Sequence, residues 1–439
     1  MGTARSLAFL MTLTWTSLGQ TDLPYTICTN FEQVLKLQNA RYLPLTRVSD
    51  PGTPERRFYN GFFFYQVLQF DNTGRYLLGL RVYCPTRDVK PEDRGDVGYI
   101  DLKNGYKWTK IGETTAWNWQ QGNRLQWRPR SDEIVWNDRS DDGKKFVSRV
   151  YNFGTRTRRT LPRPIYDLSP DGSTALTHDF ERMSAFKGTE YVGIEDSFEK
   201  EFAPKQTGIW KMDMDTGKVE LVLTLEKMAA IAYPKGKPAA GHLYFFREGW
   251  NPSGTRLVTF IKDHENQLFH AYSLTPEGTD VRYLYFNPSH HAWLDDNHII
   301  DYGHHAPPGG GNPIGGYFLF KDDGTGQAQE LLWPSSFDGH DSLLPGPGGD
   351  WIISDTYVID RYQYLFLYHR PTKLFVPLAK LKSTAEDIPN FTSEYRVDLH
   401  PRFSRDGRIV SIDSTYEGLG RQMYVIDISS ILDHPPRRP

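Results

Sequence analysis

A short pattern of apolar and polar residues recurs seven times along the chain: an apolar run, a tight polar turn, and a second apolar run. Repeats of roughly 40–50 residues with strand and turn signals are typical of β-propellers, in which each repeat forms one blade. The pattern therefore predicts an all-β fold, a seven-bladed β-propeller. The turns of the seven copies are marked by Gly74, Asp132, Gly172, Gly254, Asn297, Gly349 and Gly407.

Each copy continues into a third strand and a further turn, as in GYIDLKNGYKW, where Asn-Gly is a strong hairpin signal. The seventh copy ends at residue 430 without an obvious fourth strand, and an unpaired strand edge is a liability in a closed ring. We therefore expect a strand within residues 41–48 to complete the last blade and close the propeller.

The pattern divides the chain into four parts. We expect a signal peptide over 1–19, an N-terminal arm with the closing strand over 20–57, the propeller over 58–430, and a disordered, proline-rich tail over 431–439. The longest step between repeats holds a polar, charged insertion at about 181–206. Long insertions of this kind often edge the binding site of a scaffold.

The N-terminus has the pattern of a secretory signal peptide, with Arg5 before an apolar stretch and the small residues Ser17 and Gly19 before position 20. The first residues also fit an N-myristoylation pattern, but the apolar run favours the signal peptide. We therefore expect an exported protein, secreted or periplasmic. No other stretch approaches the ~20 apolar residues of a membrane span.

Composition narrows the choice of partners. The net charge is −3, so charge does not favour a nucleic-acid partner. Aromatic residues make up 14% of the chain, and some excess is common in proteins that stack sugar rings on aromatic faces. We expect a monomer. Cys28 and Cys84 either form one disulfide in an oxidising compartment or remain two buried thiols.

Aligning the seven copies indicates where the chemistry is concentrated. The residues at the start of each first apolar run begin the innermost strand of their blade, so they should meet at the mouth of one central funnel. Three imidazoles on consecutive blades and two guanidinium groups therefore converge on one small region. The aligned residues are Val67, Arg124, Ile165, Arg247, His290, His340 and His400.

Two of the histidines are preceded by an acid, in Asp338-Gly-His340 and Asp398-Leu-His400. Residues i and i+2 of a strand face the same way, so each Asp can orient its imidazole or join it on a metal, although capping of the preceding loop is equally open. Clusters of His and Asp are typical of metal sites. We predict that His290 and these four residues hold a divalent cation, Mn or Ca.

A second recurrence is an Asp after the second strand of most copies, and most of these aspartates are expected to form turns. Tyr357, Tyr416 and His242 are further groups expected near the funnel mouth. The recurring aspartates are Asp138, Asp179, Asp263, Asp301, Asp355 and Asp413.

These groups suit β-elimination on a uronate-containing saccharide. The reaction needs a cation to neutralise the carboxylate, a base to remove the C5 proton and an acid to protonate the leaving oxygen. Arg124 and Arg247 suit the first role, a histidine the second, and Tyr357 or Tyr416 the third. Hydrolysis by two carboxylates is less favoured, because no pair stands out from the turn-forming acids.

Three segments, LSPDG, NPSG and HPRFSRDG, resemble the TolB-type propeller repeat. With histidines near the axis of an exported propeller, the chain is similar to the oligogalacturonate lyases, seven-bladed propellers with a His-bound manganese. The resemblance implies that Arg247 meets the substrate carboxylate, that His290, His340 and His400 supply metal ligands, and that His242 is a candidate base.

The chain departs from that family in one respect: it has no Gln-x-x-His-x-His run, which the family uses to bind its metal. Propeller lyases acting on ulvan or on rhamnose-glucuronate linkages remain alternatives. The leading hypothesis is an exported lyase that cleaves an acidic oligosaccharide or polysaccharide. The alternative is a non-catalytic propeller that binds a glycan or a protein partner, and a hydrolase or other metalloenzyme is the third possibility.

Overall fold

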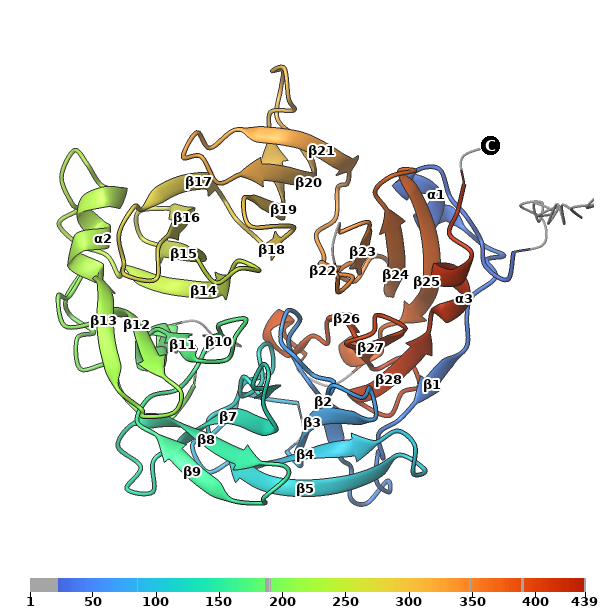
Figure 1. The fold of residues 1–439 in the computed structure, drawn as a ribbon, viewed down its shortest axis with the longest axis horizontal. Helices are drawn as coiled ribbons and strands as arrows, with labels where there is room; N and C mark the ends of the chain where they lie inside the picture. The colour runs from blue at the N-terminus through green and yellow to red at the C-terminus, as the bar shows by residue number, and fades with distance from the viewer. Residues whose placement is uncertain are drawn as a thin grey trace, which may run out of the picture.

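The computed structural model describes residues 23–84, 86–185, 189, 191–346, 349–387 and 391–437. Seven four-stranded antiparallel sheets stand as blades around a central axis (Figure 1). The predicted seven-bladed β-propeller is thus confirmed.

The first four blades follow one another along the chain, each with its innermost strand first. They consist of β2 (Tyr59–Gly61), β3 (Tyr76–Val82), β4 (Gly95–Asp101) and β5 (Lys107–Thr114); β6 (Gln126–Trp127), β7 (Glu133–Arg139), β8 (Phe146–Asn152) and β9 (Arg158–Leu161); β10 (Asp167–Leu168), β11 (Thr174–Thr177), β12 (Gly208–Asp213) and β13 (Val219–Thr224); and β14 (Tyr244–Trp250), β15 (Leu257–Asp263), β16 (Leu268–Leu274) and β17 (Arg282–Phe286).

The next two blades repeat this order, and the last combines the two ends of the chain. They consist of β18 (Ala292–Trp293), β19 (His298–His305), β20 (Ile314–Lys321) and β21 (Ala328–Pro334); β22 (Ser342–Leu343), β23 (Trp351–Ser354), β24 (Tyr362–His369) and β25 (Leu374–Lys382); and β26 (Arg402–Phe403), β27 (Ile409–Ser414) and β28 (Gln422–Asp427) with β1 (Leu45–Arg47). The helices are α1 (Phe31–Lys36), α2 (Leu225–Ala232) and α3 (Ser429–Asp433), with 3₁₀ turns η2 (Phe180–Ala185), η3 (Ala385–Asp387) and η4 (Ser393–Tyr395).

The turns behind the repeat pattern need a left-handed backbone. Gly74, Gly172, Gly254 and Gly407 have φ between 64° and 76°, a region that costs other residues energy. At Gly172 space is limiting too, since a Cβ would lie 2.3 Å from the carbonyl oxygen of Pro129 in the preceding blade. These glycines therefore set both the hairpins and the spacing between blades.

The last blade ties the two ends of the chain together. Strand β1 pairs antiparallel with β28, placing Leu45 opposite Ile426, and its residues lie within the range 41–48 predicted from the sequence. The tail predicted to be disordered, 431–439, begins with residues that are packed in the structure. Helix α3 runs to Asp433, Ile431 is fully buried, and Tyr25 donates to the carbonyl oxygen of His434.

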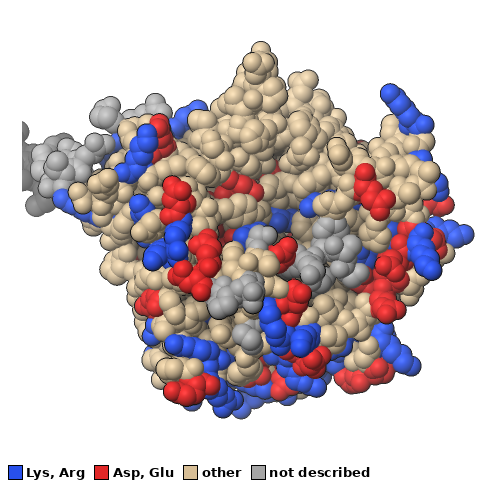
Figure 2. All heavy atoms as spheres, turned by 180° about the vertical axis from the view of Figure 1, so that it is seen from behind, with Lys and Arg blue, Asp and Glu red and all other residues tan. Residues whose placement is uncertain are grey.

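Both cysteines are free thiols in the structure, so the disulfide alternative is not realised. The expected signal peptide, 1–19, lies outside the described residues. Within the part of the chain that the structure describes, no helix is long and apolar enough to cross a membrane. The face in Figure 2 carries intermixed Lys, Arg, Asp and Glu side chains, so surface charge does not single out a binding site there.

Candidate active site

The register predicted from the sequence brings three histidines together. His290, His340 and His400 each lie two residues before the innermost strand of their blade, β18, β22 and β26. The ring centroids of neighbouring histidines are 4.1 Å apart in both pairs, and all three residues are buried. Imidazoles from three consecutive blades thus form one continuous cluster.

Buried aspartates hold the backbone of these histidines. Asp301 in β19 accepts from the N–H of His290 at 2.8 Å. Asp355 accepts from the N–H and the Nδ1 of His340 and from the N–H of His400 in the next blade. These members of the recurring Asp series therefore position the histidine-bearing segments.

The segment after β2, residues 62–65, packs against the three histidines and is called the plug here. Tyr65 is fully buried, and its ring centroid lies 5.6, 5.5 and 6.0 Å from those of His290, His340 and His400. Asp413 accepts from the N–H groups of Phe62 and Phe63 and fixes this segment. This plug was not predicted from the sequence, where its only signal is the aromatic run FFFY in the first repeat.

A cavity of about 300 Å³ lies at the histidine cluster. A larger hollow of about 1050 Å³ lies between the first two blades, but arginines there are already paired, as Arg149 is with Asp138. The site residues predicted from the sequence that line the smaller cavity are Arg247, His290, His340, Tyr357, Asp398 and His400.

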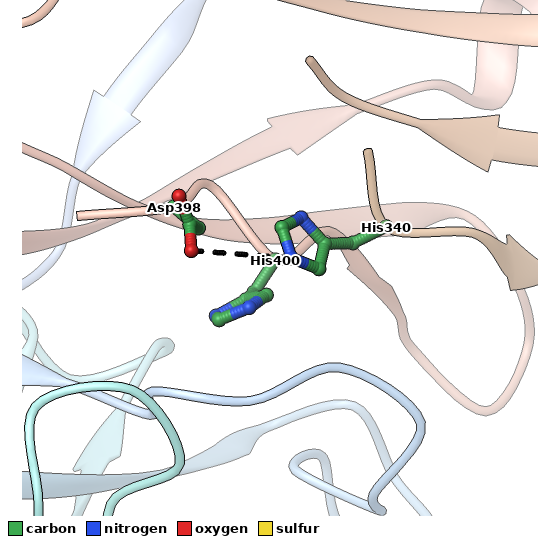
Figure 3. Close-up of side chains that lie close together, drawn as sticks. All are labelled: His340, Asp398 and His400. Carbon is green, nitrogen blue, oxygen red and sulfur yellow. Dashed lines mark ion pairs between the residues drawn. The ribbon is translucent and has the colours of Figure 1, made fainter. Parts of the chain in front are cut away.

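Three of these residues form a candidate metal site (Figure 3). His340, Asp398 and His400 each offer one ligand atom, all within 4.8 Å of one another; no other such group of three exists among the described residues. The Nε2 atom of His340 is buried without a hydrogen-bond partner, 3.9 Å from Asp398 Oδ2. Imidazole nitrogen and carboxylate oxygen are ligands that Mn and Zn accept. These residues fit a divalent transition metal.

His290 lies in a second arrangement. Arg247 Nη2 donates to its Nε2 atom, with the two nitrogens 2.8 Å apart, and the Tyr357 hydroxyl lies 3.4 Å from the same Nε2. Its Nδ1 faces Ser289 Oγ at 3.0 Å and Asp338 at 3.3 Å. Because Arg247 can only donate, Nε2 is the acceptor and the ring proton sits on Nδ1.

Burial holds the pKa of His290 well below its usual range, and the positive charge of Arg247 lowers it further. The imidazole is therefore neutral at physiological pH. Burial has the opposite effect on the Asp338 carboxyl and raises its pKa to about 6. His290 and Asp338 lie outside the group of three ligand atoms, so the structure brings together three of the five predicted ligands. Asp338 pairs with His290 of the preceding blade, because the loop before β22 packs against Ser289.

Three predicted site residues lie elsewhere. Arg124 is buried against the Tyr166 ring, 3.9 Å from its centroid, and donates to the Tyr166 carbonyl. His242 contacts the carbonyl oxygen of Arg182 at 3.0 Å, and Tyr416 packs on Tyr424. None of the three lines the cavity. Their packing against neighbouring loops, which the register of the repeats does not determine, keeps these three side chains away from the cavity.

Two cations in the cavity wall were missed. Arg396 donates to Asp398 at 3.0 Å and its guanidinium lies 4.8 Å from the Tyr357 ring centroid. The alternation Arg396-Val-Asp398-Leu-His400 is a strand-like signal that places all three on one side. Lys262, near the end of β15, has no such signal. Thr189 of the charged insertion also lines the cavity, as expected for that segment.

No family model matches the chain, and no curated protein matches it in sequence. Among solved structures it is similar to an oligogalacturonate lyase in complex with manganese, at a TM-score of 0.60 and 14% identity over 92% of this chain and 96% of that one. It is also similar to an oligogalacturonate lyase from Vibrio parahaemolyticus, at 0.56 and 12% over 92% and 97%. The chain is a seven-bladed β-propeller that resembles the oligogalacturonate lyases in fold.

Proposed function

We propose that this protein is a lyase that cleaves a uronate-containing oligosaccharide by β-elimination. The observation that carries the proposal is the neutral imidazole of His290, whose Nε2 faces the Arg247 guanidinium at 2.8 Å inside a cavity. A base and a carboxylate-binding cation are thereby held side by side, as abstraction of a proton next to a carboxylate requires.

Arg247 binds the uronate carboxylate and stabilises the negative charge that develops when the C5 proton leaves. His340, Asp398 and His400 would hold a divalent cation, with manganese favoured by the fold resemblance. When bound, such a cation supplies further neutralisation of the carboxylate as a Lewis acid. The cation site and Arg247 line the same cavity.

When the substrate carboxylate takes over the Arg247 donor, the Nε2 lone pair of His290 is released and accepts the C5 proton. The C4–O bond breaks, and a C4=C5 double bond forms as the oxygen departs with the bonding pair. Tyr357 is the acid that protonates this oxygen. Burial and the nearby carboxylates of Asp338 and Asp398 raise the pKa of its hydroxyl, which therefore keeps its proton until the leaving group takes it. Arg396 packs on the Tyr357 ring and orients it.

The test is the ultraviolet absorbance of the unsaturated product, measured on a panel of uronate oligosaccharides with added Mn²⁺. His290→Ala should lower the rate by about 10²–10⁴-fold, the contribution of a general base. His242→Ala is the matched control, since this second predicted base lies outside the cavity, and it should retain the rate. A flat trace from the wild-type protein on every substrate, with binding retained, would assign the propeller to glycan binding instead.

We propose further that the protein is exported and monomeric. The signal pattern over 1–19 supports export. Expression with secretion should yield a mature chain that starts at Gln20, and light scattering should give the mass of one chain. A full-length N-terminus or a dimer mass would contradict these two points separately.

A further inference from the structure

A second cavity lies among the inner strands on the other side of the plug. Its volume is about 560 Å³, against about 300 Å³ for the cavity at the histidine cluster. Phe64 of the plug lines the histidine cavity, whereas Gln66, the first residue after the plug, lines the second one. None of the residues proposed for the elimination lines this second cavity.

The second cavity follows the inner strands past the histidines. His290 and His340 line the histidine cavity, and the residues directly after them, His291 and Asp341, line the second one. Pro252, in the turn after β14, also lines it and is exposed, so the cavity extends to the surface at this turn. It is therefore a site of its own, separate from the one proposed for the elimination.

The wall of the second cavity is largely apolar. The innermost strands of six blades, which surround the centre of Figure 1, each contribute to it. Cavities of this volume, with apolar walls and a few polar groups, are typical of sites for small molecules. The residues contributed by these strands include Gln126, Leu168, Trp250, Trp293, Leu343 and Phe403.

Two buried polar side chains in this wall have unmet interactions. Asp341 is fully buried, and its carboxylate oxygens have no hydrogen-bond partner of good geometry among the described residues, although the Ser354 hydroxyl is near enough to favour the charged form. His291 is 2% exposed, and its Nδ1 atom has no partner in the same part of the chain. Burial lowers the pKa of His291 to about 3, so the imidazole is neutral and one ring nitrogen can accept a hydrogen bond.

The charges around Asp341 favour a cation. The carboxylates of Asp301, Asp338 and Asp355 act on it with like charge. Asp167, on β10, places a second carboxylate in the wall of the cavity. Removing a carboxylate from water without a counter-charge is costly, so a positive ligand group at Asp341 stabilises the site.

The two arginines in the wall are directed to other groups. Arg402 donates to Asp413 at 3.1 Å and to the carbonyl oxygen of Phe64 at 2.8 Å, and thereby supports the plug. Arg405 donates through Nε to the carbonyl oxygen of Phe70. The counter-charge for Asp341 is therefore to be supplied by a ligand.

We propose that the second cavity binds a small organic cation, a primary ammonium group carried on an apolar body. The ammonium has three N–H donors and no acceptor, which suits the Asp341 carboxylate and the His291 ring nitrogen. The apolar body packs on the wall that contains Trp250 and Trp293. This site does not depend on the proposed lyase activity.

An organic cation fits this cavity better than a bare metal ion. The volume of about 560 Å³ far exceeds that of an ion. Among the described residues, the only group of three side chains with ligand atoms close enough to share a metal is the one at the histidine cluster. Apolar walls also contribute nothing to the coordination of a metal, whereas they stabilise a hydrocarbon body.

The experiment titrates the full-length, Mn²⁺-loaded protein with benzylamine and with its neutral counterpart benzyl alcohol, and measures binding by calorimetry. The amine should bind at least about 10-fold more tightly than the alcohol. Asp341→Asn should weaken binding of the amine about 10- to 100-fold, the range for a hydrogen bond to a charged group, and leave binding of the alcohol unchanged.

Asp398→Asn is the matched control, since it makes the same change in the histidine cavity, and it should retain the affinity for benzylamine. A loss in Asp398→Asn with none in Asp341→Asn would assign the amine to the histidine cavity and overturn the inference. Asp167→Asn should also weaken binding of the amine, and it decides the question if melting temperatures show that Asp341→Asn is unfolded.

Potassium chloride distinguishes an ammonium site from a site for inorganic cations. Benzylamine should raise the melting temperature of the wild type and not that of Asp341→Asn, because a ligand stabilises the folded state that binds it. The same concentration of KCl should not reproduce this difference. Equal affinity for amine and alcohol, binding of neither, or an equal effect of KCl would each overturn the inference, the second result leaving a cavity that holds water only.

Discussion

The inner ends of blades 2 and 4 present the same residue type at the same register with opposite outcomes. Arg124 and Arg247 both have a left-handed backbone, with φ of 54° and 59°, and their guanidinium groups lie 4.7 and 5.6 Å from the Phe64 ring centroid. Arg124 is enclosed by Tyr166 of blade 3, whereas Arg247 faces His290 of blade 5 and lines the cavity.

The neighbouring blade makes the difference. Blade 3 places an aromatic face and a carbonyl oxygen against Arg124, and this oxygen accepts from Nε and Nη2 of the guanidinium. Blade 5 places a neutral imidazole against Arg247, and a β-bulge between Phe246 and Glu248 leaves Arg247 outside the regular pairing of β14 with β15. Because the two arginines share one register, they lie at the same depth in the funnel. Packing against the next blade then decides which of them can meet a ligand.

The largest effect that tests this comparison is expected from Arg247→Ala. Loss of a preorganised charge at the reacting centre should lower kcat/KM for uronate elimination by about 10²–10³-fold. Steady-state kinetics on the Mn²⁺-loaded protein measures it. A comparable kinetic loss in Arg124→Ala, corrected for the folded fraction, would contradict the distinction between the two blades.

Phe64→Ala removes the ring that both arginines share. Removal of the buried phenyl ring should lower the free energy of unfolding by about 3–5 kcal/mol, the usual range for Phe→Ala in a core. Chemical denaturation measures it, and Phe64→Leu should recover most of the loss because it refills the space. A near-neutral result for Phe64→Ala would show that the plug does not support the ring of inner strands.

Asp338 and Asp398 sharpen the comparison, since each precedes a histidine by two residues. Asp398→Asn should weaken Mn²⁺ binding by more than about 10-fold, because it removes a charged ligand. Asp338→Asn should leave Mn²⁺ affinity nearly unchanged, since Asp338 faces His290. Titration of Mn²⁺ by calorimetry decides, and equal losses in the two variants would refute the three-residue site.

Arg124→Met tests the enclosed arginine by itself. It removes the hydrogen bonds to the Tyr166 carbonyl and should lower the free energy of unfolding by about 1–3 kcal/mol. The kcat/KM of the folded protein should stay close to that of the wild type. Thermal melting and kinetics together check the result, and a loss of activity without a loss of stability would place Arg124 in the site.

Tyr416→Phe should have the smallest effect. Its hydroxyl is 3.4 Å from Glu417 and does not line the cavity, so both stability and activity should change by less than about 0.5 kcal/mol. Tyr357→Phe is the informative partner, because its hydroxyl faces His290. Similar rates for the two variants would remove the acid role from Tyr357.

The sequence predicted much of the candidate site because propeller repeats carry their register in local signals. A turn residue in each copy and a large apolar residue three positions after each histidine suffice to place His290, His340 and His400 at one level of the funnel. Arg396 could have been predicted in the same way, because it is the first member of an alternating run that ends at His400. Lys262 was not, because a lysine near a strand end has many possible surroundings.

By itself, then, the sequence determined the number of blades, their turns and the ring of residues at their inner ends, since these depend on interactions between residues close in the chain. The tertiary structure alone decided which of those residues face the cavity. The plug at Tyr65, the pairing of Asp338 with His290 and the enclosure of Arg124 by Tyr166 all join residues from different blades. Such contacts depend on how side chains fill the space between sheets, which no local pattern encodes.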